Sequence, residues 1–327
     1  MIDLAKPETE FTLRVVGEAA RLAKKIRQEM LSPALSKEDR SPVTVADFAT
    51  QALIGRALLE SFPHDCLVAE EDAGPLATRQ GRHTLQQVTQ FLAALIPDLD
   101  SRQVCDWIDR GKGECEARFW TLDPIDGTKG FLRVDQYAVA LALVEEGQVQ
   151  VGALGCPNLD EGWLVVAARG EGCWKTSLDG DDGFDRLQVS DCREPSAARI
   201  LRSFESAHTN EGQMKELQKS LGTGTDPLAM DSQAKYAVLA AGRGDLLFRL
   251  PSPTHPDYQE RIWDHAAGLL LVEESGGRVT DLDGKSLDFS QGRLLANSRG
   301  VLASNGHLHQ TALEVLAIQS SHEDHTS

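Results

Sequence analysis

The chain of 327 residues is 41% apolar and 25% charged, which is enough for a sizeable core in two domains or in one large layered domain. Its formal net charge of −17 argues against a nonspecific nucleic-acid binder, because such proteins present a basic face to phosphates. The six cysteines are widely spaced, so we expect reduced thiols and neither a zinc site nor a disulfide framework.

The N-terminal segment carries no pattern typical of export. Residues 1–10 are acidic and lack the apolar stretch of a signal peptide, and no apolar run in the chain is long enough to cross a bilayer. We therefore expect a soluble cytoplasmic protein without a membrane partner, and a location in an organelle stays open.

Two helices are expected before residue 60. Residues 11–30 place apolar side chains at helical spacing, with most lysines and arginines off that face. The polar residues 31–40 are expected to form a loop, followed by a second helix that runs to Leu59. Asp47 lies in the early part of this second helix, where it either offsets the helix dipole or reaches a catalytic centre.

Three acids follow the short apolar strand expected at Cys66–Ala69. Glu70, Glu71 and Asp72 repel one another unless they are exposed or neutralised by a cation. The pattern is typical either of a solvated loop or of a metal ligand at a strand end. Glu70 is the candidate ligand because it is nearest to the strand.

Residues 73–113 form a long polar connection with two expected helices, residues 84–95 and 100–109. No chemical motif lies within it. A connection of this length indicates either a flap or an elaboration of the fold.

The central motif is the run Trp-Thr-Leu-Asp-Pro-Ile-Asp-Gly-Thr-Lys-Gly. Its apolar start, Phe119–Leu122, predicts a strand, and Pro124 is expected to end it because proline cannot donate a ladder hydrogen bond. The turn would then point Asp123 and Asp126 into one small volume, with the Ile125 carbonyl between them. Such hard oxygen ligands suit Mg²⁺. The alternative is a strand-to-turn connection whose acids only cap the backbone.

The next two residues of the motif favour an anion site. Gly127 lets the backbone approach a ligand closely, and Thr128 supplies a hydroxyl. Free amides at the start of a helix are a favourable seat for phosphate.

The second half of the chain alternates between strands and helices. Ser232 is expected to cap a helix that runs to Ala241, Arg249 lies on a strand, and Asp264 lies at the N-terminal end of a buried helix. The tail after Gln319 is expected to be disordered. The expected strands are residues 136–144, 149–154, 162–168, 172–176, 200–204, 226–229, 245–250, 278–280 and 301–303. The expected helices are residues 232–241, 266–272 and 306–318, and loops are expected at 177–185 and 251–257.

This alternation predicts two units. Residues 1–176 would form an α+β domain that carries most of the candidate metal ligands. Residues 177–327 would form an α/β domain that carries the last acid, Asp264.

Five acids at element ends, with Asp-Pro-Ile-Asp-Gly-Thr in the middle, resemble the Mg²⁺-dependent, lithium-sensitive phosphatase superfamily that includes inositol monophosphatase and fructose-1,6-bisphosphatase. The resemblance covers nearly the whole chain. Within that superfamily it is closest to the 3′(2′),5′-bisphosphate nucleotidase branch. The segments that carry this narrower resemblance are Ser41–Thr44, Trp120–Phe131, Ser206–Thr209, Ser232–Tyr236 and Tyr258–Gly268.

The resemblance implies a layered αβαβα sandwich and a role for each site residue. Asp47 and Thr128 would form a proton relay to the attacking water. The ligands of two or three Mg²⁺ would be Glu70, Asp123, the Ile125 carbonyl, Asp126 and Asp264. The substrate contacts would come from Gly127, Thr128, His208, Ser232, Lys235 and Arg249.

The activity implied by the resemblance is hydrolysis of the 3′-phosphate of adenosine 3′,5′-bisphosphate to AMP and phosphate. The 2′,5′ isomer and 3′-phosphoadenylyl sulfate would be related substrates, lithium would inhibit, and the protein would be a monomer or a weak homodimer. One alternative is an inositol phosphate phosphatase with the same metals. Another is a catalytically silent nucleotide-binding regulator, which is disfavoured because no expected ligand has been lost.

Overall fold

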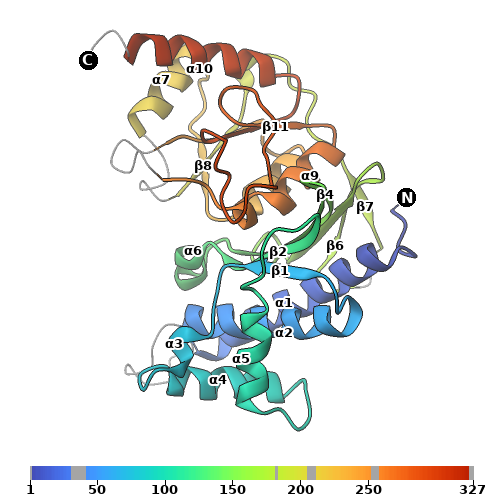
Figure 1. Cartoon of the computed structure of the whole chain (residues 1–327). Helices are drawn as coiled ribbons and strands as arrows, with labels where there is room; N and C mark the ends of the chain where they lie inside the picture. Colours follow the sequence, from blue (N-terminus) through green and yellow to red (C-terminus); the bar gives the residue numbers. More distant parts are fainter. Residues whose placement is uncertain (1, 31–41, 181–182, 205–210, 252–257, 324–327) are drawn as a thin grey trace.

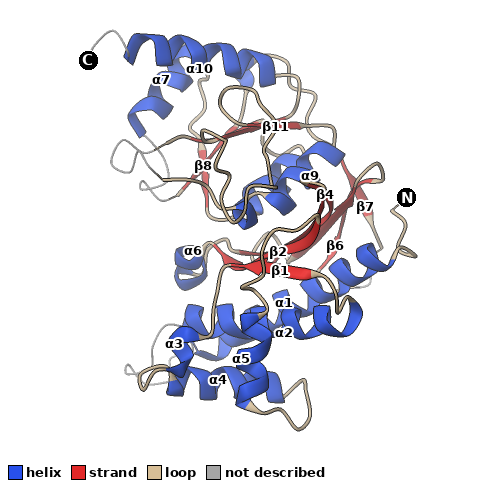
Figure 2. Cartoon of the chain, viewed as in Figure 1, coloured by secondary structure: helices blue, strands red, loops and turns tan. Residues whose placement is uncertain are grey.

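The computed structural model describes residues 2–30, 42–180, 183–204, 211–251 and 258–323. Two β-sheets are stacked with helices on both outer faces and between them (Figures 1 and 2). This arrangement confirms the αβαβα sandwich. The expected loop at 31–40 lies outside the described residues.

The first sheet has seven strands in the order of the chain, from β1 to β7. All neighbours pair antiparallel except β1 and β2, which are parallel and therefore end at the same edge. The expected strands are confirmed to within a few residues, but β7 falls in the expected loop 177–185 and beyond it. The strands are β1 Cys66–Ala69, β2 Arg118–Asp126, β3 Ala138–Glu145, β4 Gln148–Cys156, β5 Trp163–Ala168, β6 Gly172–Ser177 and β7 Asp185–Leu187.

Strand β3 shows why this sheet is buried on both faces. Leu141 and Leu143 belong to the core formed with helices α1 (Pro7–Met30) and α2 (Pro42–Ser61). On the opposite face β3 presents small alanines to α9 (Ala266–Glu274), which lies between the two sheets. Because successive side chains of a strand point to opposite faces, the large leucines of β3 pack against α1 and α2, and its small alanines let α9 approach closely.

The second sheet has five strands in the order β11-β12-β10-β8-β9. Helix α8 (Ala234–Ala240) lies with α9 on its inner face, and α7 (Glu211–Leu221) and α10 (His309–Glu323) pack on its outer face. The strands are β8 Ile200–Ser203, β9 Leu228–Met230, β10 Leu246–Arg249, β11 Arg278–Thr280 and β12 Val301–Ser304.

The long polar connection forms three helices on the side of the first sheet away from the second (Figure 1); α4 and α5 pack against α2, and α3 packs against α4. They are α3 (Gly74–Ala77), α4 (Arg82–Ala93) and α5 (Ser101–Asp109). The two expected helices are confirmed, and Asp100 caps α5 by accepting the Arg102 amide at 3.1 Å. These helices extend the outer layer and supply no residue to the lining of the pocket described below, which favours an elaboration of the fold over a flap.

The prediction that Pro124 ends its strand is wrong. Strand β2 continues to Asp126, and its pairing with β3 moves from Asp123 opposite Ala140 to Asp126 opposite Ala138. Three steps along β2 therefore face two steps along β3, which defines a β-bulge with one extra residue. A bulge lacks one ladder bond, so it accommodates a residue without an N–H group.

The C-terminal part corrects two further expectations. Helix α10 continues to Glu323, so the tail is not disordered from Gln319 onward. Helix α7 has no counterpart among the predicted elements. Helix α7 buries only Met214, Leu217 and Leu221 in the outer-layer core, so its apolar periodicity is short.

Candidate active site

A pocket of about 740 Å³ lies where the first sheet faces the elements of the second. It contains every predicted site residue except two. Asp47 does not line it, and His208 lies outside the described residues, as does the segment Ser206–Thr209. The predicted residues that line the pocket are Glu70, Asp123, Ile125, Asp126, Gly127, Thr128, Ser232, Lys235, Arg249 and Asp264.

Four acids form what we call the carboxylate corner: Glu70, Asp123, Asp126 and Asp264. Glu70 follows β1, whose parallel pairing with β2 brings it to the edge where the bulge presents Asp123 and Asp126. Asp264 ends the short 3₁₀ helix η3 (Ile262–Asp264), directly before α9. Segments nearly 200 residues apart in the chain thus supply one group of oxygen atoms.

The electrostatics of the corner are unfavourable without a cation. Burial raises the pKa of Asp123 well above its usual range, and the charges of Glu70, Asp126 and Asp264 raise it further. Burial and Asp126 likewise raise the pKa of Asp264. Asp123 is 3% exposed, and its Oδ1 atom is buried without a hydrogen-bond partner among the described residues.

Glu70, at the pocket wall, is in a similarly unfavourable electrostatic environment. Its enclosure by protein and the charge of Asp126 raise its pKa, against a hydrogen bond with Asp123 that lowers it. Two carboxyl groups can share a hydrogen bond only if one of them holds a proton. An orphaned oxygen within a hard-oxygen donor set fits a divalent cation such as Mg²⁺.

Asp126 connects the corner to the second half of the chain. Its Oδ2 atom accepts the backbone amide of Gln233 at 2.6 Å. The Gln233 side chain in turn donates to the Trp263 carbonyl at 2.9 Å and accepts the Gly268 amide at 3.2 Å. The bulge, α8 and α9 are therefore held together by one amide side chain and one carboxylate.

Asp47 lies behind the corner and not in it. Helix α2 begins at Pro42 and has no acid in its first turn, so Asp47 sits too deep to offset the helix dipole there. The residue is buried, and burial, followed by the charges of Glu71 and Glu70, raises its pKa well above the usual range. No hydrogen bond joins the described side chains of Asp47 and Thr128.

Gly127 and Thr128 confirm the expected start of a helix. Gly127 has a φ of 86° and precedes α6 (Thr128–Arg133), as expected for a left-handed position that favours glycine. A Cβ atom at Gly127 would lie 2.9 Å from the Cβ of Ser232, so the close approach also requires glycine.

Ser232 does not cap α8 in the expected way. The N-cap residue is Gln233, which makes no side-chain cap bond, and Ser232 has a φ of 63°. Its Oγ accepts the Ala234 amide at 3.2 Å, and its carbonyl accepts Lys235 Nζ at 2.8 Å. The turn before the helix leaves a serine hydroxyl at the pocket wall.

Lys235 is buried at the base of the pocket. Besides the Ser232 carbonyl, its ammonium group donates to the Met230 carbonyl at 3.1 Å. Burial lowers its pKa to about 8, although the charge of Asp126 acts in the opposite direction. An ammonium has three donors, so one remains for a ligand.

Arg249 sits in a chain of side chains that we call the Arg249 network: Ser203, Arg249, Glu260, His265 and Tyr236. Arg249 donates to Glu260 at 2.9 and 3.3 Å and to Ser203 Oγ at 3.3 Å. Glu260 also bonds to His265, whose second ring nitrogen contacts the Tyr236 hydroxyl at 2.7 Å. Although burial favours the neutral acid, Arg249 and His265 hold the pKa of Glu260 far below its usual range.

Comparison with known proteins identifies the family of the chain. Residues 8–321 match the inositol monophosphatase family. The chain belongs to the inositol monophosphatase family. Members of this family are metal-dependent phosphatases, which agrees with the donor set of the carboxylate corner.

The similar curated proteins share a name. A 3′(2′),5′-bisphosphate nucleotidase of Schizosaccharomyces pombe is 38% identical over 97% of this chain and 97% of its own length. The enzyme of the same name from Emericella nidulans is 39% identical over 88% of this chain and 91% of its own. The rice protein of that name is 38% identical over 93% and 91%.

The solved structures agree on the family fold. An IMPase of Thermotoga maritima has a TM-score of 0.64 at 21% identity and covers 96% of this chain and 98% of its own. The inositol monophosphatase of Anabaena has a TM-score of 0.63 at 23% identity, over 93% and 94%. No helix in the described part of this family member is long and apolar enough to span a membrane.

Sequence reasoning missed several residues that shape this family pocket. Glu260 and His265 lie inside the segment Tyr258–Gly268, which the sequence analysis singled out. Their partners Arg249 and Tyr236 lie outside it, so the segment alone did not indicate the contacts. Arg293 had no signal, because it follows no recognisable element. It donates to the carbonyls of Ala69 and Gly111 and lies over the Trp263 ring at 4.7 Å, which fixes the edge of the first sheet.

Proposed function

We propose that this chain is a Mg²⁺-dependent phosphatase that hydrolyses the 3′-phosphate of adenosine 3′,5′-bisphosphate to AMP and phosphate. One observation supports this more than any other. The carboxylate corner and two cationic side chains, Lys235 and Arg249, line the same pocket. A ligand with two phosphates fits such a site, one at the metals and one at the cations. The names of the similar curated proteins support the same substrate class.

Glu70, Asp123, Asp126, Asp264 and the Ile125 carbonyl would hold two or three Mg²⁺. Bound Mg²⁺ supplies charge that stabilises the phosphoryl group and lowers the pKa of water. The protein's task is to keep these oxygens converged. The Gln233 amide does this for Asp126, and the bulge does it for Asp123.

The segment around α6 would bind the phosphate that is cleaved. Gly127 and Thr128 line the pocket at the start of this helix, and their amides would donate to phosphate oxygens. The Thr128 hydroxyl would accept a proton from the attacking water and pass its own proton to Asp47. A threonine hydroxyl is a weak base, so it needs a carboxylate behind it.

The phosphate that is not cleaved would bind on the other side of the pocket. Lys235 has one donor there that no described residue accepts, and Arg249 and Ser232 line the same wall. We assign His208 to this set from the sequence resemblance alone. Adenosine 2′,5′-bisphosphate and 3′-phosphoadenylyl sulfate would bind in the same way.

A substrate panel tests the proposed function. Phosphate release is measured with Mg²⁺ and with EDTA on adenosine 3′,5′-bisphosphate, adenosine 2′,5′-bisphosphate, 3′-phosphoadenylyl sulfate and inositol 1-phosphate. We expect the highest kcat/KM on a bisphosphate or the phosphosulfate, no turnover in EDTA, and loss of turnover in Asp126→Ala. A preference for inositol 1-phosphate, or turnover in EDTA, would contradict the proposal.

Three further features stay proposals. They are a cytoplasmic location, a state of monomer or weak homodimer, and the division into two domains. Light scattering after size exclusion tests the oligomeric state, and cell fractionation tests the location. The division into residues 1–176 and 177–327 is tested by expressing each part alone and measuring whether it unfolds cooperatively.

A further inference from the structure

Arg249 is not a free cation at the pocket wall, because Glu260 holds its guanidinium. The Nη2 group donates to Glu260 Oε2 at 2.9 Å, and Nε donates to Oε1 at 3.3 Å, which is a two-point contact. The Nη1 group donates to Ser203 Oγ at 3.3 Å. Arginine has five N–H groups, so within the described chain two remain for a ligand in the pocket.

Glu260 is itself fixed from behind. His265 Nε2 lies 3.0 Å from Glu260 Oε2, and His265 Nδ1 lies 2.7 Å from the Tyr236 hydroxyl. A carboxylate can only accept, so Nε2 carries the shared proton. His265 and Tyr236 are each 2% exposed, and they belong to the packed start of α9 and to α8. The carboxylate therefore has little freedom to turn.

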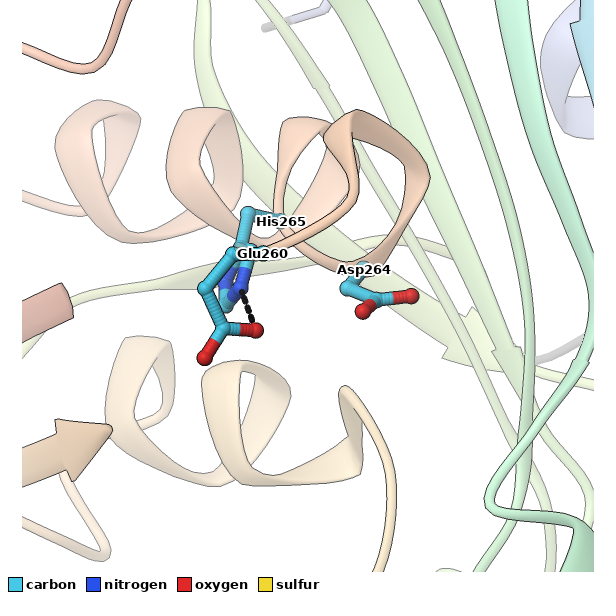
Figure 3. A group of neighbouring side chains, drawn as sticks. All are labelled: Glu260, Asp264 and His265. Carbon is cyan, nitrogen blue, oxygen red and sulfur yellow. Dashed lines mark hydrogen bonds and ion pairs between the residues drawn. The ribbon is translucent and has the colours of Figure 1, made fainter. Parts of the chain in front are cut away.

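The same residues could be read as a metal site, because the ligand atoms of Glu260, Asp264 and His265 lie within 4.8 Å of one another. Figure 3 argues against that reading. Glu260 and His265 point toward each other and share a hydrogen bond, whereas the Asp264 carboxylate points away from both. Glu260 is also paired with Arg249, so a cation there would have to displace a guanidinium.

We propose that Glu260 is a positioning residue that orients Arg249 toward the phosphate that is not cleaved and so sets the preference for substrates with two phosphates. This inference rests on the proposed function. The Arg249–Glu260 pair is neutral as a whole, so its contribution to phosphate binding comes from the direction of two N–H groups and not from net charge. Lys235 supplies the net charge on this wall.

The test compares two substrates that differ only in the phosphate that is not cleaved. KM and kcat are measured for adenosine 3′,5′-bisphosphate and for adenosine 3′-monophosphate, with Mg²⁺, in wild type and Glu260→Gln. Glutamine keeps the volume but loses one acceptor oxygen. We expect KM for the bisphosphate to rise by about 10- to 100-fold, the range for a hydrogen bond to a charged group. KM for the monophosphate and both kcat values should change by less than about threefold.

A double-mutant cycle shows whether Glu260 acts through Arg249. In the Arg249→Met background, Glu260→Gln should change KM for the bisphosphate by less than about twofold, because the group it orients is gone. Glu260→Asp keeps the charge but shortens the side chain, so it should raise KM as Glu260→Gln does. The control is Glu274→Gln, since Glu274 accepts the amides of Gly170 and Gly172 away from the pocket.

Each outcome either supports or rejects the positioning role of Glu260. Equal effects of Glu260→Gln on both substrates, an undiminished effect in the Arg249→Met background, or a normal Glu260→Asp would overturn the inference. Calorimetric binding of AMP, which carries the phosphate that is not cleaved, separates this result from failure of the proposed function. A wild type that binds AMP but hydrolyses no bisphosphate rejects the function, and AMP affinity in Glu260→Gln still tests the positioning role. A wild type that binds no AMP rejects both.

Discussion

Buried acids in and beside this pocket have an unfavourable electrostatic energy, which a bound cation would offset. Asp123 is buried with an oxygen that no donor among the described residues reaches, and Glu71 stands beside two further acids, Glu70 and Asp72. Gln51 of α2 holds the Glu71 backbone by accepting its amide at 3.1 Å and donating to its carbonyl at 2.6 Å. The Glu71 backbone therefore stays beside the other acids.

Replacing Asp123 should have opposite effects on activity and on metal-free stability. With Mg²⁺, Asp123→Asn should lower turnover by at least about 100-fold, because a metal ligand is lost. In EDTA it should raise the melting temperature by about 2–6 °C, since a buried ionisable group among other acids is replaced by a neutral amide. Phosphate release and thermal unfolding measure the two effects. The control is Asp98→Asn on an exposed loop, and a lower melting temperature in EDTA would contradict the argument.

Glu71 should make metal-free stability depend on pH. Burial, followed by the charges of Glu70 and Asp72, raises its pKa from 4.5 to about 7. The folded state then binds more protons than the unfolded state between these values, so stability should fall as pH rises from about 4.5 to 7. Urea unfolding in EDTA at several pH values measures the slope. Glu71→Gln should flatten it, whereas Glu161→Gln on an exposed turn should not; an unchanged slope in Glu71→Gln would refute the assignment.

At the scale of elements, a β-bulge and a left-handed glycine direct β2 and α6 toward the pocket. The bulge in β2 turns two acids toward the same space, and the left-handed Gly127 starts α6 immediately afterward. Helix α6 is then pressed against the turn before α8. A Cβ atom at Gly130 would lie 2.0 Å from the Gln136 carbonyl oxygen and 2.8 Å from an Asp231 carboxylate oxygen.

Gly130→Ala should therefore displace α6. The clash with a backbone oxygen cannot be relieved by a side-chain rotation, so we expect a loss of about 2 kcal/mol or more in the free energy of unfolding. Turnover should fall as well, because Thr128 moves with the helix. Urea denaturation and phosphate release measure these effects. Gly224→Ala is the matched control, because a Cβ atom there would meet nothing within 4 Å; equal stability changes in both variants would refute the close-packing argument.

At the scale of the whole molecule, the carboxylate corner joins the two sheets. Glu70, Asp123 and Asp126 belong to the first sheet, and Asp264 precedes the helix that lies between the sheets. The Asp126–Gln233 bond and the contacts of Arg293 with Ala69 and Gly111 cross the same boundary. Cation binding should therefore act on the stability of the entire fold.

Mg²⁺ should raise the melting temperature of the whole chain in one transition. A ligand at about 100 times its Kd adds about 2.7 kcal/mol to the free energy of unfolding, which corresponds to about 4 °C in a chain of this size. Calorimetry with Mg²⁺ and with EDTA, at matched ionic strength, measures the shift. Asp264→Asn should lose most of it, and a shift of equal size in this variant would show that Mg²⁺ acts elsewhere.

The sequence alone determined the types of most elements, though not of α7 and β7, as well as the position of the acids at element ends and the family resemblance. Periodicity and the signals at element ends depend on neighbouring residues, so they can be recognised in the sequence itself, as the confirmed strands and the helix after Gly127 show. Only the tertiary structure decided that β2 continues through Pro124, because a bulge depends on the register of the partner strand. The same holds for the pairing of Arg249 with Glu260 and of His265 with Tyr236, since such contacts join residues that only packing brings together.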